Sequence, residues 1–272
     1  MKEKSEESFL KNASSMGGIA RYTILALTIL ALLPATLFAE SIRVGYFIVP
    51  PYAMREEINK ELKGAAVEFL EKILAPEMGV KVIWAKEPTS IPRQLFQLDN
   101  HELDAGLGFA KNHERAKFLN FPRNPIIEAT SGLALIKNHP LRDVKKVEDI
   151  LDLKIGYVHK AYLSPFMRDK RIRFEFVSQK NAIFLNLQKL LAGRIDAQYQ
   201  PNVVPLLYYA RKFNAEDKIK IIHFPEKMRT YTAFSKKSGK DLAERYDRAF
   251  EKVGGKEAFK AILSTYVNID RN

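Results

Sequence analysis

The sequence predicts an α/β protein built on doubly wound sheets. Two observations carry this prediction. Residues 41–109 alternate strand-like and helix-like segments in the order β-α-β-α-β, and a second alternation follows a strand-like run near 130–136. Strands that alternate with helices typically form a mostly parallel sheet with helices on both faces. The 272 residues, 46% of them apolar, suffice for one large domain or two smaller ones.

Five segments form the first alternation. The strand-like runs are rich in β-branched and aromatic residues, and the helix-like runs carry apolar residues at intervals of three and four. Pro50 and Pro51 close the first strand, and Pro92 fits the first turn of the second helix. In chain order we predict a strand over 41–49, a helix over 57–75, a strand over 80–85, a helix over 91–98 and a strand over 103–109.

The second alternation and the C-terminal segment follow the same rules. Gly193 is a suitable stop residue for a strongly apolar helix that precedes it. No low-complexity linker or short tandem repeat interrupts the chain. We predict strands over 130–136, 154–158, 174–177, 195–199, 219–224 and 230–234, and helices over 147–151, 182–192, 203–213, 242–253 and 258–266.

The N-terminal segment reads as an export signal. Residues 22–33 (YTILALTILALL) are an uncharged apolar run, which is long enough for a signal-peptide core and short of the roughly twenty residues that span a bilayer. Pro34 and a small-residue stretch ending at Ala39 follow it. We therefore predict a signal peptide over residues 1–39, with Met16 as a possible true start, and a periplasmic location. An uncleaved anchor of the same topology is the alternative.

Composition excludes several kinds of chemistry. The chain has no cysteine, so it has no disulfide scaffold, thiolate metal site or lipid-carrying cysteine. Its five histidines show no i, i+4 pair, and the GxSxG and HExxH patterns are absent. We expect no metal, no cofactor and no catalytic activity.

The basic excess belongs to the mature part of the chain. The net charge is +12, and residues 1–39 hold only four basic and three acidic residues, which leaves 40 basic and 29 acidic residues, or +11. Such a charge attracts small anions, anionic lipid or nucleic acid. The run 168–174 (RDKRIRF) fits a solvated edge strand, and for an exported protein we expect no nucleic-acid partner.

The order of five stretches resembles the periplasmic solute-binding proteins of polar amino acid uptake, the bacterial family 3 extracellular binding proteins. The resemblance covers nearly all of residues 41–266. It rests on IRVGYFIVPPYA (42–53), ELDAGLGFAKNHERAKFLNFP (102–122), EDILDLKIGYVHKAYLS (148–164), LQKLLAGRIDAQYQP (187–201) and YTAFSKKSGKDLAERYDRAFEKV (231–253).

The resemblance implies the two-lobed periplasmic binding protein fold of type II, in which each lobe is a doubly wound mixed sheet and two crossing segments join the lobes. Lobe one would comprise 41–131 plus 230–272, and lobe two 135–225. It also implies that a small polar or anionic solute binds between the lobes and is delivered to the inner-membrane permease of an ABC importer. We expect a monomer.

In lobe one, the resemblance places Arg115 on a ligand carboxylate, which a guanidinium holds through two parallel hydrogen bonds. The loop before Arg115 is one residue shorter than usual in the family. Phe47 and Tyr52 fall where the family has an aromatic wall, and Gly108 and Phe109 would offer backbone to the ligand. A surface arginine and aromatic core packing are the alternatives.

In lobe two, Lys160, Tyr162 and Gln200 occupy the positions that would close on the ligand. Pro201 stands where the family has the acidic residue that binds an α-ammonium group, so we do not expect a standard α-amino acid as ligand. For Lys160, a solvated loop position is the alternative. The near-repeats ELDAG and RIDAQ carry Asp104 and Asp196, which the resemblance marks as structural.

Two other functions stay open. A binding protein of this type can present its ligand to a sensory receptor. Some relatives of the fold are dehydratases with an acid in the cleft, and Glu87 and Glu128 are the candidate acids here. A carboxyl group with a raised pKa in the cleft would favour the enzyme.

Overall fold

A computed structural model of the chain describes residues 40–56, 59–159, 162–178, 181–238 and 241–267. The export segment expected over 1–39, and Lys160, lie outside these residues. Among the described residues, no helix is both long enough and apolar enough to cross a bilayer.

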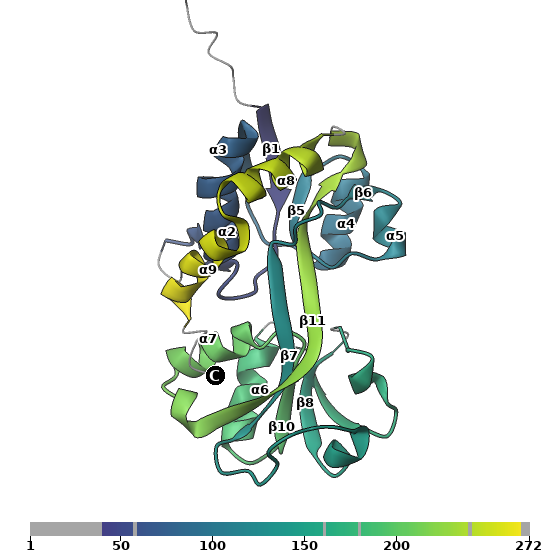
Figure 1. Cartoon of the computed structure of the whole chain (residues 1–272), viewed down its shortest axis with the longest axis vertical. Helices are drawn as coiled ribbons and strands as arrows, with labels where there is room; N and C mark the ends of the chain where they lie inside the picture. The colour runs from purple at the N-terminus through teal and green to yellow at the C-terminus, as the bar shows by residue number, and fades with distance from the viewer. Residues whose placement is uncertain (1–39, 57–58, 160–161, 179–180, 239–240, 268–272) are drawn as a thin grey trace, which may run out of the picture. The chain divides into compact units, whose positions relative to one another are not determined.

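The elements follow the predicted alternation (Figure 1). The strands are β1 Glu40–Gly45, β2 Met54–Arg55, β3 Leu62–Lys63, β4 Val80–Trp84, β5 Ala105–Phe109, β6 Leu119–Asn120, β7 Ile127–Ile136, β8 Lys154–Val158, β9 Arg173–Val177, β10 Ala197–Gln200 and β11 Ile219–Ser235. The α-helices are α2 Ala65–Glu68, α3 Ala75–Met78, α4 Ile91–Asp99, α5 His113–Ala116, α6 Ala182–Leu191, α7 Val204–Lys212, α8 Leu242–Lys252 and α9 Gly255–Tyr266. A π-helical segment, η1 Phe69–Leu74, joins α2 to α3, and short 3-10 turns are η2 Val147–Ile150, η3 Phe166–Arg168, η4 Glu216–Lys218 and η5 Lys236–Ser238.

Two groups of three parallel strands have the same order. In the first strand group β1 lies between β4 and β5, and in the second strand group β8 lies between β9 and β10. In each group the middle strand comes first in the chain, as the doubly wound pattern requires. Strand β11 pairs antiparallel with β5, and β7 pairs antiparallel with β10.

Strands β7 and β11 connect the two groups. They pair antiparallel from Ile136↔Ile219 to Ile127↔Thr230, with a shift of register between His223 and Lys227. Figure 1 shows them running side by side between the first and second strand groups. The two strands predicted over 219–224 and 230–234 are therefore one strand with an irregularity, located where Pro225 lacks an N–H for the ladder.

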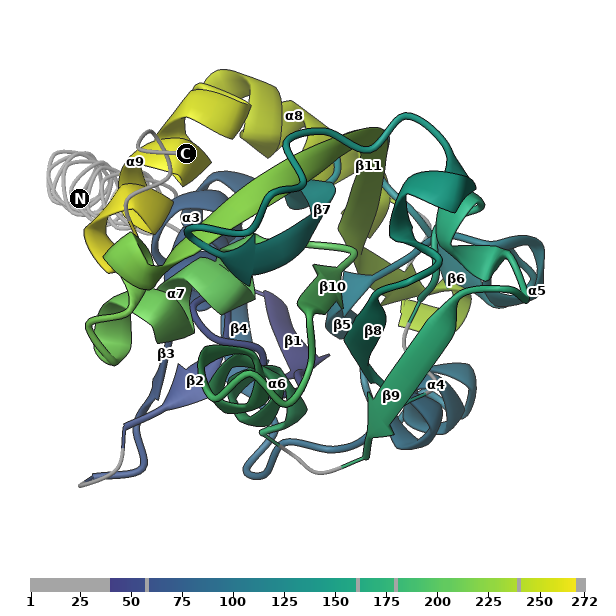
Figure 2. The same cartoon turned by 90° about the horizontal axis from the view of Figure 1, so that it is seen from below.

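Helices cover both strand groups with buried apolar side chains. On the first group, Phe69, Phe250 and Phe259 pack with β1 in one cluster, and Leu98 of α4 packs with Phe109 in another. On the second group, α6 and α7 pack against β7 in one cluster, and Figure 2 shows the arrangement of these elements. An aromatic cluster around Tyr157 and Tyr199 is the other.

The helix predicted over 57–75 begins later than expected. Its helical run starts at Ala65, and the residues before it form the short antiparallel pair β2 and β3. Gly64 has a φ of 132°, a value that side chains disfavour, and the N–H groups of Ala65 and Ala66 donate to the carbonyls of Pro51 and Tyr52. These bonds start the helix against the Pro-Pro segment.

Asp104 and Asp196 make equivalent contacts in the two strand groups. The Asp104 carboxylate accepts a hydrogen bond from the N–H of Arg43 at 2.8 Å, and the N–H of Asp104 donates to the Arg43 carbonyl. Asp196 makes the same two bonds with Lys154, also at 2.8 Å for the carboxylate. The near-repeats ELDAG and RIDAQ thus fasten β5 to β1 and β10 to β8.

Candidate functional site

Four of the residues predicted for the site lie together at the end of β5. The rings of Phe47 and Phe109 meet edge to face with centroids 6.3 Å apart, and the Arg115 guanidinium lies 5.6 Å from the Phe109 centroid. Gly108 has a φ of +85°, and a Cβ on it would lie 3.3 Å from the Phe47 ring. Phe109 is only 1% exposed and belongs to the core, so the accessible part of this group consists of Phe47, Gly108 and Arg115, which are all partly exposed.

Short-range capping bonds position Arg115. It lies on α5, which the sequence did not predict because it has only four residues. The Asn112 side chain caps the helix by accepting from the N–H of Arg115 at 2.8 Å. At the other end, the Lys236 ammonium donates to the carbonyls of Ala116 and Lys117.

The Arg115 guanidinium is a half-buried cation without a carboxylate partner among the described residues. Its Nη1 donates to the carbonyl of Ala110 at 2.8 Å, and burial lowers its pKa. An arginine stays charged after such a shift, because its ordinary pKa is far above neutral. The remaining N–H donors are available to an anion, and a planar carboxylate matches them in geometry.

Tyr52 is placed differently from the prediction. Its ring is only 3% exposed and stacks on Phe259 rather than on a solute, with centroids 6.3 Å apart and planes 11° from parallel. Its hydroxyl is hydrogen bonded to the Asn202 side chain, and burial raises its pKa. The Pro-Pro-Tyr segment thus holds the ring in the core, beside a 220 Å³ cavity.

Of the three site residues predicted in the second strand group, the structure describes two, Tyr162 and Gln200. Tyr162 is 48% exposed, its carbonyl accepts from the Tyr157 hydroxyl, and its ring faces the Arg168 guanidinium. Gln200 is buried at the end of β10, opposite Gly132 of β7. Its Nε2 has no partner among the described residues, so it has donors to spare. Lys160 lies outside the described residues.

Glu226 is a polar residue of this region that the sequence analysis missed. It lies in the irregular part of β11, and one of its carboxylate oxygens accepts from the N–H of Phe166 at 3.3 Å. The other oxygen is buried and has no partner among the described residues. Register irregularities often re-aim side chains near functional sites. The adjacent Pro225, which directly follows the strand predicted over 219–224, was the available signal.

Glu128, one of the two candidate acids, does not have the raised pKa that a dehydratase acid would need. Glu128 accepts from Arg229 at 2.7 Å and from Lys227 and Lys256 at 3.4 Å. These cations hold its pKa at about 2, so it is deprotonated at neutral pH. Glu87 is exposed and pairs with Arg55.

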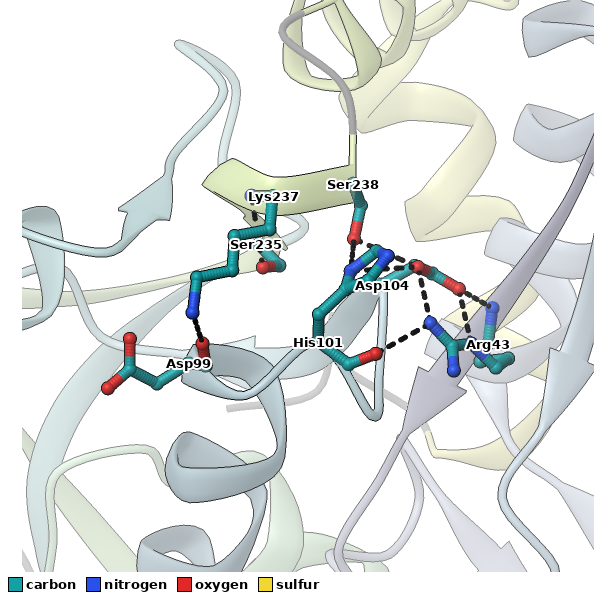
Figure 3. Close-up of polar contacts among 7 residues, drawn as sticks. All are labelled: Arg43, Asp99, His101, Asp104, Ser235, Lys237 and Ser238. Atoms are coloured by element: carbon teal, nitrogen blue, oxygen red, sulfur yellow. Dashed lines mark hydrogen bonds and ion pairs between the residues drawn. The ribbon is translucent and has the colours of Figure 1, made fainter.

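A Ser-His-Asp group lies at the other end of the first strand group, where Asp104 precedes β5 (Figure 3). The Ser238 hydroxyl donates to the Asp104 carboxylate at 2.9 Å and lies 3.0 Å from Nδ1 of His101. The serine hydroxyl and the aspartate carboxylate thus both lie at Nδ1 of His101. In a catalytic triad the serine lies at one ring nitrogen of the histidine and the aspartate at the other. With Arg43 bound to Asp104, the group fastens β1, β5 and the end of β11.

In the described part of the chain, we also compared the cavities and the groups of possible metal ligands with the predicted binding site. A 670 Å³ cavity lies between β9 and α6, lined in part by Phe176, Leu185 and Lys189, and contains none of the predicted site residues. Among the described residues, no three His, Asp or Glu side chains are grouped to hold a metal ion.

Comparison with solved structures identifies the fold. The chain is similar to the probable amino-acid ABC transporter extracellular-binding protein YtmK from Bacillus subtilis, with 17% identity, a TM-score of 0.70, and 85% of this chain and 99% of that one covered. It is also similar to a histidine kinase sensor domain that itself resembles periplasmic binding proteins (17%, TM-score 0.65, 84% and 96% covered).

A third similar structure is the ancestral amino acid-binding protein AncCDT-1, a precursor of cyclohexadienyl dehydratase (19%, TM-score 0.63, 84% and 95% covered). No protein-family model and no curated protein matches the sequence. The predicted fold class is confirmed: the chain has the Venus flytrap fold of type II periplasmic binding proteins.

Proposed function

We propose that the protein is an exported solute-binding protein, which captures a small polar or anionic solute between two lobes and delivers it to an ABC importer. The lobes are 41–131 plus 230–272 and 135–225, joined through β7 and β11. The observation that carries the proposal is Arg115, a half-buried guanidinium over the ring of Phe109 with no carboxylate partner among the described residues.

Partial burial of the Arg115 guanidinium without a carboxylate partner costs free energy. A partly buried cation loses hydration and is stabilised by an anion that reaches it. Phe47 adds flat apolar area near the charge, the buried Phe109 ring supports it from the core, and Gly108 leaves the backbone at the end of β5 accessible to a close neighbour. From the second lobe, Gln200, Tyr162 and Lys160 would complete the enclosure, with the free Nε2 of Gln200 as a donor.

A screen of ligands tests the binding function. Small carboxylates and other polar metabolites are added to the purified protein, and its melting temperature is measured as each concentration is raised. A true ligand stabilises the folded state by mass action, so the shift grows with concentration. A complete absence of concentration-dependent shifts across carboxylates, phosphorylated compounds and amino acids would count against the proposal.

Arg115→Gln then tests the site. We expect at least tenfold weaker binding of a carboxylate ligand, because the anion loses its charged partner. Arg93→Gln is a matched control, since the Arg93 guanidinium also lies over a phenylalanine ring, 5.3 Å from the centroid of Phe96, but on the exposed face of α4. Equal affinity in the Arg115 variant and the native protein would remove Arg115 from the site.

A second candidate function is presentation of the ligand to a sensory receptor, which the similarity to a histidine kinase sensor domain supports. Reconstitution of the protein with each partner separates the two functions. Stimulation of ATP hydrolysis by a permease supports import, and ligand-dependent binding to a receptor domain supports sensing.

We also propose that the chain is cleaved after residue 39, is located in the periplasm and is a monomer. N-terminal sequencing of the periplasmic fraction tests the cleavage and the location, and size-exclusion chromatography with light scattering tests the monomer.

A further inference from the structure

The positive charge of the chain is concentrated in one part of the fold. Residues 135–225 hold seventeen Lys and Arg against nine Asp and Glu, a net charge of +8. The remainder of residues 40–272 holds 23 basic and 20 acidic residues, a net charge of +3. The excess is therefore a local property of the part that contains the second strand group.

Four of these cations form what we call the basic tip: Lys137, Arg142, Lys218 and Lys220. They lie where β7 ends and β11 begins, because Ile136 pairs with Ile219 in the ladder. The N–H of Lys137 donates to the Lys218 carbonyl at 2.8 Å, so the backbone holds Lys137 beside Lys218. Lys137, Arg142 and Lys218 are exposed, and Lys220 is partly buried among them.

The basic tip has no internal countercharge. None of its four cations forms an ion pair with a carboxylate of the described residues, and the Lys220 ammonium donates to the carbonyl of His139 instead. Burial, and then the charges of Arg142 and Lys137, lower the pKa of Lys220. The nearest carboxylates in sequence, Asp143, Glu216 and Asp217, are exposed, and none of them pairs with the four cations in the described part; Asp143 pairs with Lys145. An external anion would relieve this repulsion.

Large apolar side chains are exposed beside the cations. Ile136, which directly precedes Lys137, is 43% exposed, and Phe213, five residues before Lys218, is 46% exposed. Phe213 stacks on Phe184 with centroids 4.2 Å apart, so its ring is held in place. Cations interspersed with exposed apolar side chains are typical of surfaces that bind the lipid–water interface, whereas nucleic acids are bound mainly through cations and stacking rings.

We propose that the basic tip docks on an anionic phospholipid bilayer, with the four cations at the lipid phosphates and with Ile136 and Phe213 in the headgroup region. Each Lys or Arg near such a surface contributes to binding, and the contribution falls off within a Debye length. Docking through this end leaves the Arg115 region, on the first strand group, free to bind solute.

Co-sedimentation with vesicles tests the proposal on the full-length mature protein. We expect binding to vesicles of phosphatidylcholine with about 30% phosphatidylglycerol, little binding to pure phosphatidylcholine, and at least tenfold weaker binding when salt rises from about 0.03 M to about 0.3 M. The variant with Lys137→Gln, Arg142→Gln and Lys218→Gln should bind at least tenfold more weakly than the native protein.

A charge-matched control distinguishes the basic tip from the net charge. Lys60→Gln, Lys81→Gln and Lys86→Gln remove the same charge from the other part of the chain, and this variant should bind vesicles as the native protein does. Ile136→Ser with Phe213→Ser should weaken binding at high salt as well as at low salt. Each variant is first checked for an unchanged melting temperature. Three outcomes would overturn the proposal: an equal loss of vesicle binding in the basic-tip variant and the charge-matched control, absence of binding to anionic vesicles, or equally tight binding to double-stranded DNA.

Discussion

The phenol of Tyr52 and the side-chain amide of Asn202 are hydrogen bonded to each other across 150 positions of the sequence, and both residues are buried. The Asn202 Nδ2 donates to the phenol oxygen at 3.1 Å, and its Oδ1 accepts from the N–H of Val204 at 3.0 Å. The pair therefore fixes the start of α7 against the segment that follows β1. This contact links the first and second strand groups independently of β7 and β11.

Removing the Tyr52 hydroxyl should destabilise the protein. Tyr52→Phe keeps the ring on Phe259 but leaves a buried amide without its partner, so we expect a loss of about 1–2 kcal/mol in the free energy of unfolding. Urea denaturation followed by circular dichroism measures it. Tyr231→Phe is the control, because no hydrogen bond of the Tyr231 hydroxyl is found among the described residues. Equal stability of the two variants would show that the bond contributes nothing.

A side chain at Gly108 should disturb the candidate site more than its backbone angle alone explains. Gly108→Ala places a methyl group 3.3 Å from the Phe47 ring at a φ of +85°, whereas Gly193→Ala has a φ of +65° and no atom within 4 Å. The control isolates the strain of the left-handed region, about 1 kcal/mol. We expect a larger loss of stability for Gly108→Ala, measured by urea unfolding, together with weaker ligand binding. Identical losses of stability in the two variants would mean that the Phe47 ring moves away from the added methyl group at no cost in free energy.

The cap of α5 should matter for binding as well as for stability. Asn112→Ala removes the side chain that accepts from the N–H of Arg115, and loss of such a cap typically costs about 1 kcal/mol. Because α5 has only one turn, we expect the guanidinium to shift and ligand affinity to fall severalfold in calorimetry. Ser90→Ala removes the cap of α4 instead and should leave affinity unchanged. A drop in affinity in both variants would indicate a general loss of stability.

Glu128 should make stability depend on pH in the acid range. Its pKa is held at about 2 in the folded state, below its ordinary value of 4.5, so the folded protein binds fewer protons than the unfolded chain. The stabilisation, at most about 3 kcal/mol, is fully present above pH 4.5 and is lost as the pH falls toward 2. We expect Glu128→Gln to be less stable than the native protein at pH 6, and the difference to shrink by pH 3.

A pH series of urea unfolding curves provides that comparison. Glu87→Gln serves as control, because the Glu87 side chain is exposed and its pair with Arg55 lies at the surface. A difference between the native protein and Glu128→Gln that stays constant from pH 6 to pH 2.5 would contradict the assignment.

Most of the fold could be predicted from local sequence patterns. The strands β4, β8 and β9 and the helices α4, α6 and α8 lie within one or two residues of their predicted bounds, because each has a clear apolar period or a Ser, Pro or Gly at its end. The start of the helix at Ala65 could not be predicted, since it depends on bonds to the carbonyls of Pro51 and Tyr52 rather than on periodicity.

The site was predictable only in part, for a physical reason. Gly108 and Phe109 end β5, Phe47 follows the neighbouring strand β1, and Arg115 lies on the short helix α5 just after β5. These residues could be predicted together because each follows directly from a recognisable strand. Tyr52 was expected at a solute wall because it is aromatic and follows Pro-Pro, but its partners, Phe259 and Asn202, are far away in sequence. Glu226 was missed because a single acid in a strand has no periodic signature.

The ladder between β7 and β11 is interrupted between His223 and Lys227. A two-stranded ribbon whose backbone hydrogen bonds are all formed is stiff, and a short stretch that lacks some of these bonds is more flexible than the rest. Rotation of one strand group against the other would therefore concentrate its torsion in residues 223–227. Substitutions at Pro225 or Lys227, which are exposed, would change the opening angle and its rate and leave intact the hydrophobic cluster to which the neighbouring Phe224 belongs.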